Sequence, residues 1–155
     1  MDPELTGDMK FAAQLNRYLD KRKEYGYIFL RLIIGWRLID GTQDNVFSYS
    51  RMLEFRDFLE QHNVVFPLLA AHVSVYAQFI CGILIMLGAY IRISALIMVI
   101  NFIAAILIAH IGLTFEQSFD ALMMLFGSAF FFIAGAGKIS IDDFRKRRNK
   151  SSPIG

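Results

Sequence analysis

Residues 66–137 of this sequence contain almost no charged residues, and the whole chain is poor in cysteine and proline. Its 155 residues include 1 cysteine and 3 prolines. A single thiol cannot form an intrachain disulfide, so dithiol redox chemistry of the Cys-x-x-Cys type is excluded within this chain. Between Phe66 and Lys138 the only lysine or arginine is Arg92. A segment with so little charge is not suited to contact with water.

Two other kinds of signal are missing. Residues 1–26 are polar and lack the apolar core of a cleavable signal peptide, so the first membrane helix is expected to act as its own insertion signal. No His-x-x-x-His or similar spacing supports a metal or haem site, and the sequence contains no cofactor motif of its own. The Gly135-Ala-Gly-Lys138 segment resembles a phosphate loop only superficially, and helix termination explains it better.

Long apolar runs are what the sequence does contain. They cover residues 68–90, 93–113 and 119–137. A helix needs roughly 20 apolar residues to cross the hydrocarbon core of a bilayer, so each run predicts a transmembrane helix. A fourth span is predicted at about 25–41, although it contains Arg31 and Arg37. Arg31 is expected to extend its charged end toward the nearer membrane surface.

The distribution of basic residues predicts the orientation of these helices. Lysine and arginine are concentrated at both ends of the chain. Arg92 lies in the short break between the apolar runs 68–90 and 93–113, whereas the loop 112–118 contains no basic residue. Under the positive-inside rule, four spans with both termini in the cytoplasm fit this distribution. The predicted organisation is a cytoplasmic segment 1–24, a four-span domain 25–138 and a basic cytoplasmic tail 139–155, with spans at about 25–41, 66–90, 93–112 and 118–137.

Two segments outside the spans have the pattern of amphipathic helices. The first, near the N-terminus, has an apolar stripe formed by Phe11, Leu15, Tyr18 and Leu19. It suits a helix lying on an anionic leaflet or one packed on the cytoplasmic face of the protein itself. The second lies in the first outer loop, around 52–61, and is either an interfacial belt or a lid. The basic tail is expected to anchor on acidic lipid and not to bind nucleic acid.

Polar residues within or beside the spans are the candidate functional residues, because polar groups in a membrane are costly. At a rise of about 1.5 Å per residue, most of them are predicted to lie in the outer third of the bundle, with Gln78 and Asn101 below. The candidates for substrate binding are Arg37, His72, Gln78, Asn101 and His110. The candidates for proton transfer are Asp40 and Asp120.

Each of these residues also has a structural interpretation. Arg37 and Asp40, three residues apart, are suited to a simple interfacial ion pair. Asp120 lies near a predicted helix start, where the helix dipole favours an acid. Gln78 and Asn101 are suited to hydrogen bonding each other as packing contacts between helices.

Several segments resemble the DoxX family. They are Arg31-Leu-Ile-Ile-Gly35, the stretch Tyr76–Gly88 with the following Arg92, the third span with His110, and Gly135–Asp142. The resemblance covers about 27–142 and implies a four-helix membrane bundle. Relatives in the family include a membrane subunit of thiosulfate:quinone oxidoreductase. The family commonly has an acidic residue where this chain has Gln78, and often has His-Gly where this chain has Asp40-Gly41.

These observations predict an all-α, four-span protein of a bacterial-type inner membrane, surrounded by lipids and forming homo- or hetero-oligomers. The leading functional hypothesis is a redox-associated membrane subunit that engages quinone in an outer-leaflet pocket, with electrons from a partner. The alternative is a non-enzymatic scaffold or assembly factor whose polar residues only hold the bundle together. A weaker third hypothesis is a small transporter or lipid-binding protein.

Overall fold

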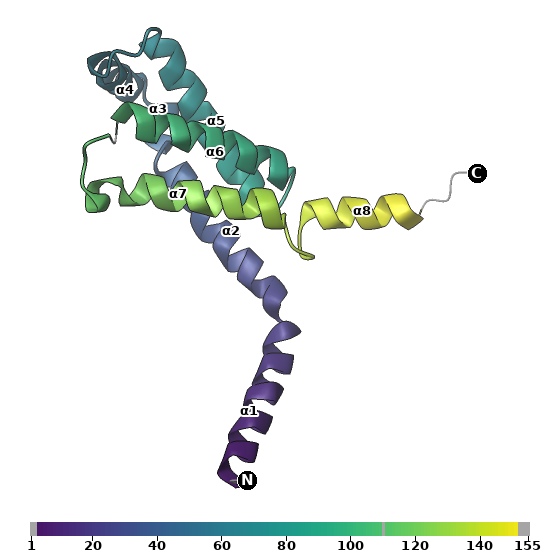
Figure 1. The fold of residues 1–155 in the computed structure, drawn as a ribbon. Coiled ribbons are helices and arrows are strands. Elements are labelled where there is room, and N and C mark those ends of the chain that lie inside the picture. Colours follow the sequence, from purple (N-terminus) through teal and green to yellow (C-terminus); the bar gives the residue numbers. More distant parts are fainter. Residues whose placement is uncertain (1–2, 110, 152–155) are drawn as a thin grey trace.

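The protein is entirely helical in the part of the chain that the structure describes. The computed structural model describes residues 3–109 and 111–151. Within these residues it contains eight helices and no strand (Figure 1). The helices are α1 (Pro3–Asp20), α2 (Lys23–Asp40), α3 (Gln43–Phe47), α4 (Tyr49–Gln61), α5 (Pro67–Leu87), α6 (Ile91–Ala109), α7 (Phe115–Ala134) and α8 (Ile141–Ser151).

Three of these helices are long and apolar enough to cross a membrane, and they coincide with the three apolar runs. They are α5, α6 and α7. Their large apolar side chains are widely exposed, as at Ile100 and Ile133, which are 61% and 74% exposed. Such surfaces suit contact with lipid. The apolar sequence of helix α2 is interrupted by Arg31 and Arg37, and its passage through the membrane stays a prediction.

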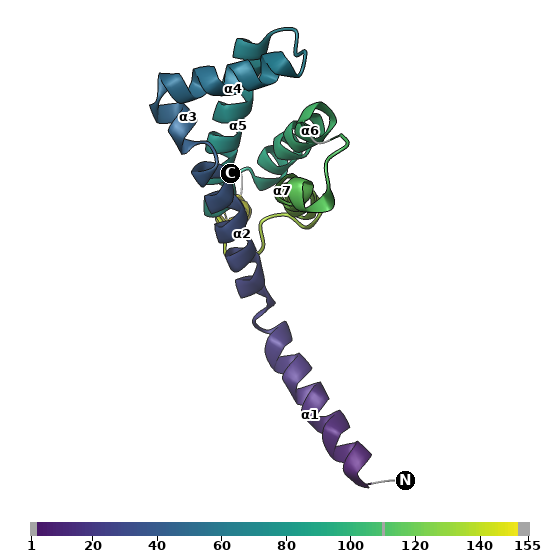
Figure 2. The same ribbon diagram turned by 90° about the vertical axis from the view of Figure 1, so that its left-hand side faces the viewer.

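The long helices associate as two pairs. Helix α2 packs along α5, and α6 packs along α7, while a short turn at Gly88–Tyr90 joins the two pairs (Figure 2). Gly88 has a φ of +67°, a left-handed conformation that glycine adopts without steric cost. Helix α2 meets α7 over a shorter stretch, where Gly127 lies directly against Ile34.

Two glycines allow α2 and α5 to approach each other closely. A Cβ atom added to Gly35 would lie 2.3 Å from Met86 Cγ and 2.7 Å from the carbonyl oxygen of Gly82. A Cβ atom added to Gly82 would lie 3.0 Å from the carbonyl oxygen of Gly35. Small residues at a crossing bring helix backbones together and increase van der Waals contact, which drives helix association where lipid removes the hydrophobic effect.

Helix α4 covers the N-terminal half of α5. Met52 and Leu59 on α4 are buried against Ala71 and Val75 on α5. These residues confirm the prediction of a short amphipathic helix after α2. Since α4 packs here along its apolar face, it covers the part of α5 that extends beyond the end of α2 at Asp40.

Helix α1 forms as the apolar stripe predicts, but it projects away from the bundle (Figures 1 and 2). Phe11, Leu15, Tyr18 and Leu19 are exposed. The interpretation in which this stripe packs on the protein's own face is therefore wrong in this structure. The last segment, expected only as a basic tail, forms helix α8.

The loop between α7 and α8 closes one end of the bundle. The guanidinium of Arg31 is buried beneath it, and its Nη2 donates to the carbonyl oxygen of Ile139 at 2.7 Å. The side chain of Arg31 thus extends toward the end of the bundle, as expected. Its guanidinium contacts the backbone of the α7–α8 loop there and not open solvent. The carboxylate of Asp142 accepts hydrogen bonds from the backbone N–H groups of Tyr90 and Ile91, at 2.8 and 2.9 Å, and so caps the start of α6.

The glycine crossing gives a first prediction. Gly35→Ala is expected to lower the midpoint of thermal unfolding, because its new methyl group would overlap Met86 and the Gly82 backbone and such overpacking costs about 1–3 kcal/mol. The midpoint is measured by heat-induced labelling of Cys81, the single cysteine, which is buried. Gly26→Ala is the matched control, since nothing lies within 4 Å of its new methyl group. Equal shifts in both variants would contradict the close crossing.

Candidate functional site

A small cavity lies where α2, α5, α6 and α7 converge. Its volume is about 220 Å³, smaller than the roughly 300–1,000 Å³ of pockets that hold drug-sized ligands. Three of the residues predicted from the sequence line it: Arg37, Gln78 and Asp120. The rest of the lining is apolar or backbone and consists of Leu38, Gly41, Phe102, Ala105, Ala121 and Met124.

An ion pair joins the two helices that face each other across this cavity. Arg37 Nη2 donates to Asp120 Oδ2 at 2.6 Å. The two side chains are 43% and 69% exposed, so the ion pair lies where the cavity opens to the surface of the bundle. The expected pairing of Arg37 with Asp40 is wrong here, since Asp40 Oδ1 accepts instead from Gln43 Nε2 at 3.2 Å.

Local structure at two helix termini sets the position of this pair. Helix α7 begins with a capping box, in which the side chains of Thr114 and Gln117 bond each other's backbone N–H groups. This cap places Asp120 in the second turn of α7. Helix α2 ends just after Arg37, where the hydroxyl of Thr42 donates to the carbonyl oxygen of Leu38 at 2.7 Å. The Thr-x-x-Gln spacing is visible in the sequence but was missed as a signal.

A chain of polar side chains runs from the cavity to α6. Gln78 Nε2 donates to Ser74 Oγ at 3.1 Å, and Ser74 Oγ donates to Asn101 Oδ1 at 2.9 Å. The expected link between Gln78 and Asn101 therefore exists, but Ser74 mediates it. Asn101 Nδ2 is buried and has no partner in the described part of the chain. Sequence reasoning missed Ser74, although it lies one turn from Gln78 on α5.

Two other candidates, His72 and Asp40, are not brought into the cavity. His72 Nδ1 is bonded to the carbonyl oxygen of Leu68 at 2.8 Å, and its ring lies 6.1 Å from that of Tyr76. Asp40 does not line the cavity. His110 lies outside the described residues. Within residues 3–109 and 111–151, no cluster of three or more histidine, cysteine or acidic residues is arranged to hold a metal ion.

The lining of the cavity thus combines polar and apolar groups. It contains a guanidinium, a carboxylate and an amide, and Phe102, Ala121 and Met124 belong to its apolar part. Arg37 uses one of its five N–H donors on Asp120, which leaves others for a ligand. Such a site can hydrogen-bond a carbonyl oxygen, exchange a proton at a carboxylate and accept a flat apolar ring.

The ion pair gives a second prediction. Arg37→Asp and Asp120→Arg are each expected to lower the unfolding midpoint, because each variant brings two like charges together. The double exchange restores the pair and should recover most of the loss, with a coupling of roughly 0.5–1 kcal/mol for a partly exposed pair. Asp40→Asn is the control and should leave the midpoint unchanged. Additive losses in the double variant would contradict the pairing.

One comparison with known proteins gave a match. The chain matches the family model described as DoxX over residues 26–111. The match extends from α2 through α6, and so includes Arg37 and Gln78 but not Asp120. Searches of curated proteins and of solved structures gave no match. Since the family model covers more than half of the 155 residues, the chain belongs to the DoxX family, and with its apolar helices it is a membrane protein.

Proposed function

We propose that this protein is the membrane subunit of a redox complex and binds the head group of a quinone in the cavity beside Arg37 and Asp120. One observation carries the proposal. A guanidinium, a carboxylate and an amide, which come from α2, α7 and α5, line one cavity whose remaining lining is mostly apolar. A quinone head group has the matching chemistry, with two carbonyl oxygens on an apolar ring. Its long tail would extend between the exposed apolar helices.

The proposal gives each polar residue a separate task. Arg37 donates a charge-assisted hydrogen bond to one carbonyl oxygen. Gln78, whose orientation is fixed by Ser74, offers the second N–H of its amide. Asp120 has one oxygen on Arg37 and holds or releases a proton at the other. A bound quinone supplies the redox chemistry by taking two electrons and two protons, and a partner subunit supplies the electrons.

The proposed setting follows from the charge distribution. Both termini would lie on the cytoplasmic side of a bacterial-type inner membrane, because the basic residues gather at the two ends of the chain. The cavity would then open in the outer leaflet, since Arg37 lies in the last turn of α2, which would run outward. The electron donor would dock as part of a hetero-oligomer.

The third prediction tests quinone binding directly. In lipid nanodiscs, Arg37→Gln and Gln78→Ala are expected to weaken binding of a short-chain benzoquinone. Loss of the charge-assisted bond from Arg37 should cost about tenfold or more in affinity. The measurement is equilibrium dialysis, with the uptake of empty nanodiscs subtracted. Asp40→Asn is the matched control, because its carboxylate does not line the cavity. Unchanged affinity in both cavity variants would contradict the proposal.

A second candidate function is a scaffold whose polar residues only stabilise the bundle. The position of the ion pair favours it, since Arg37 and Asp120 join α2 to α7, which share only a short contact. The double exchange of these two residues separates the candidates. A scaffold role predicts that the exchange restores the assembled protein completely. Quinone binding predicts recovery of stability without recovery of quinone affinity, because the guanidinium would then project from α7.

A further inference from the structure

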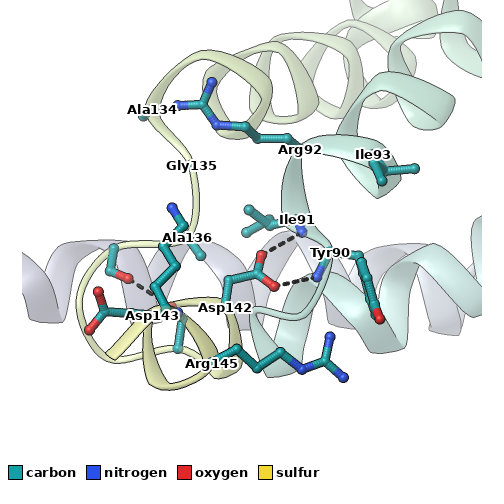
Figure 3. Close-up of a pocket in the computed structure, with 13 residues that line it drawn as sticks. Tyr90, Ile91, Arg92, Ile93, Ala134, Gly135, Ala136, Asp142, Asp143 and Arg145 are labelled. Carbon is teal, nitrogen blue, oxygen red and sulfur yellow. Dashed lines mark hydrogen bonds between the residues drawn. The ribbon is translucent and has the colours of Figure 1, made fainter. Parts of the chain in front are cut away.

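A second cavity lies at the opposite end of α7 from Asp120. It is formed where α6 begins, α7 ends and α8 begins, and its volume is about 410 Å³ (Figure 3). Asp120 and Ala134 are separated along α7 by about 21 Å at 1.5 Å per residue. The cavity is therefore distinct from the proposed quinone site.

Three cationic side chains line this cavity, namely Arg92, Arg145 and Lys146. Arg92 Nη2 donates to the carbonyl oxygen of Ile133 at 3.2 Å, which holds the guanidinium at the end of α7. The guanidinium carbon of Arg145 lies 4.6 Å above the ring of Tyr90. Within the described chain, none of the three cations forms an ion pair with a carboxylate.

The two acidic residues that line the same cavity are already engaged. The carboxylate of Asp142 accepts from the backbone N–H groups of Tyr90 and Ile91, as Figure 3 shows. Asp143 forms an ion pair with Arg147 at 2.6 Å. Arg92 lies on one side of the cavity, and Asp142 and Arg145 lie on the other. All three cations line the cavity, and neither acidic residue of its lining neutralises them through an ion pair.

The position of the cavity in the bundle indicates which kind of ligand its three cationic side chains would bind. It lies at the ends of two helices that are apolar enough to cross a membrane, and Ile93 in its lining is 61% exposed. A basic pocket between membrane helices at their ends is suited to the head group of an anionic lipid. Gly135 lines the pocket with a φ of +81°, so a side chain there would be strained.

We propose that this cavity binds the phosphate group of an anionic membrane lipid, with Arg92, Arg145 and Lys146 as its ligands and with the acyl chains lying along Ile93. The lipid would be drawn from the leaflet at the end of the bundle from which α8 departs. It would connect α6, α7 and α8, and so fix the loop that buries Arg31.

The test is native mass spectrometry of the full chain in detergent, with equal amounts of phosphatidylglycerol and phosphatidylcholine added. Wild-type protein is expected to retain the anionic lipid preferentially. Lys146→Gln should reduce that retention about fivefold, and Arg92→Gln with Lys146→Gln should reduce it by about a further fivefold, as each cation near a lipid surface contributes. Lys150→Gln removes one charge from the same helix outside the cavity and should leave retention unchanged.

Four outcomes would overturn the assignment. Equal retention of the two lipids would show that the cavity does not select charge. Equal loss in the Lys146 and Lys150 variants would show that only the net charge of α8 matters. Displacement of the lipid by an equal concentration of inorganic phosphate would assign the cavity to a free anion. Heat-induced labelling of Cys81 checks that each variant is folded, and a folded Lys146→Gln protein with undiminished retention also refutes the proposal.

Discussion

The close crossing of α2 and α5 at Gly35 and Gly82 is the contact on which the rest of the structure depends. It brings the backbone of α2, which contains two arginines, close to the backbone of the apolar helix α5. Arg31 lies one turn before Gly35 and Arg37 lies two residues after it, so the crossing fixes where both guanidinium groups emerge. One emerges beneath the loop that follows α7, and the other emerges at the cavity wall.

If α2 crosses the membrane as predicted, its two arginines need partners, because an arginine at the centre of a membrane helix costs about 2.5–3.5 kcal/mol on the insertion scale. Arg31 has the carbonyl oxygen of Ile139, and Arg37 has the carboxylate of Asp120. The bundle is thus held together at its two ends by different means. Backbone and an acidic helix cap close one end, whereas a single ion pair at the other leaves a cavity with unused donors.

Local patterns in the sequence predicted the helices and part of the candidate site. The apolar runs predicted α5, α6 and α7, and the apolar stripe containing Met52 predicted α4. Arg37 and Asp120 were both expected near one end of the bundle. Their pairing was not, because they are 83 residues apart and only the packing of α2 near α7 brings them together. The capping of α6 by Asp142 likewise depends on a contact across 51 residues.

The central claim is that the cavity beside Arg37 and Asp120 binds a quinone. Native mass spectrometry of the protein, extracted gently from its own membrane, tests it most directly. The account predicts an additional mass that matches a membrane quinone in the wild-type protein and much less of it in a folded Arg37→Gln variant. A wild-type protein that carries only polypeptide partners or lipids would contradict the claim and favour the scaffold role.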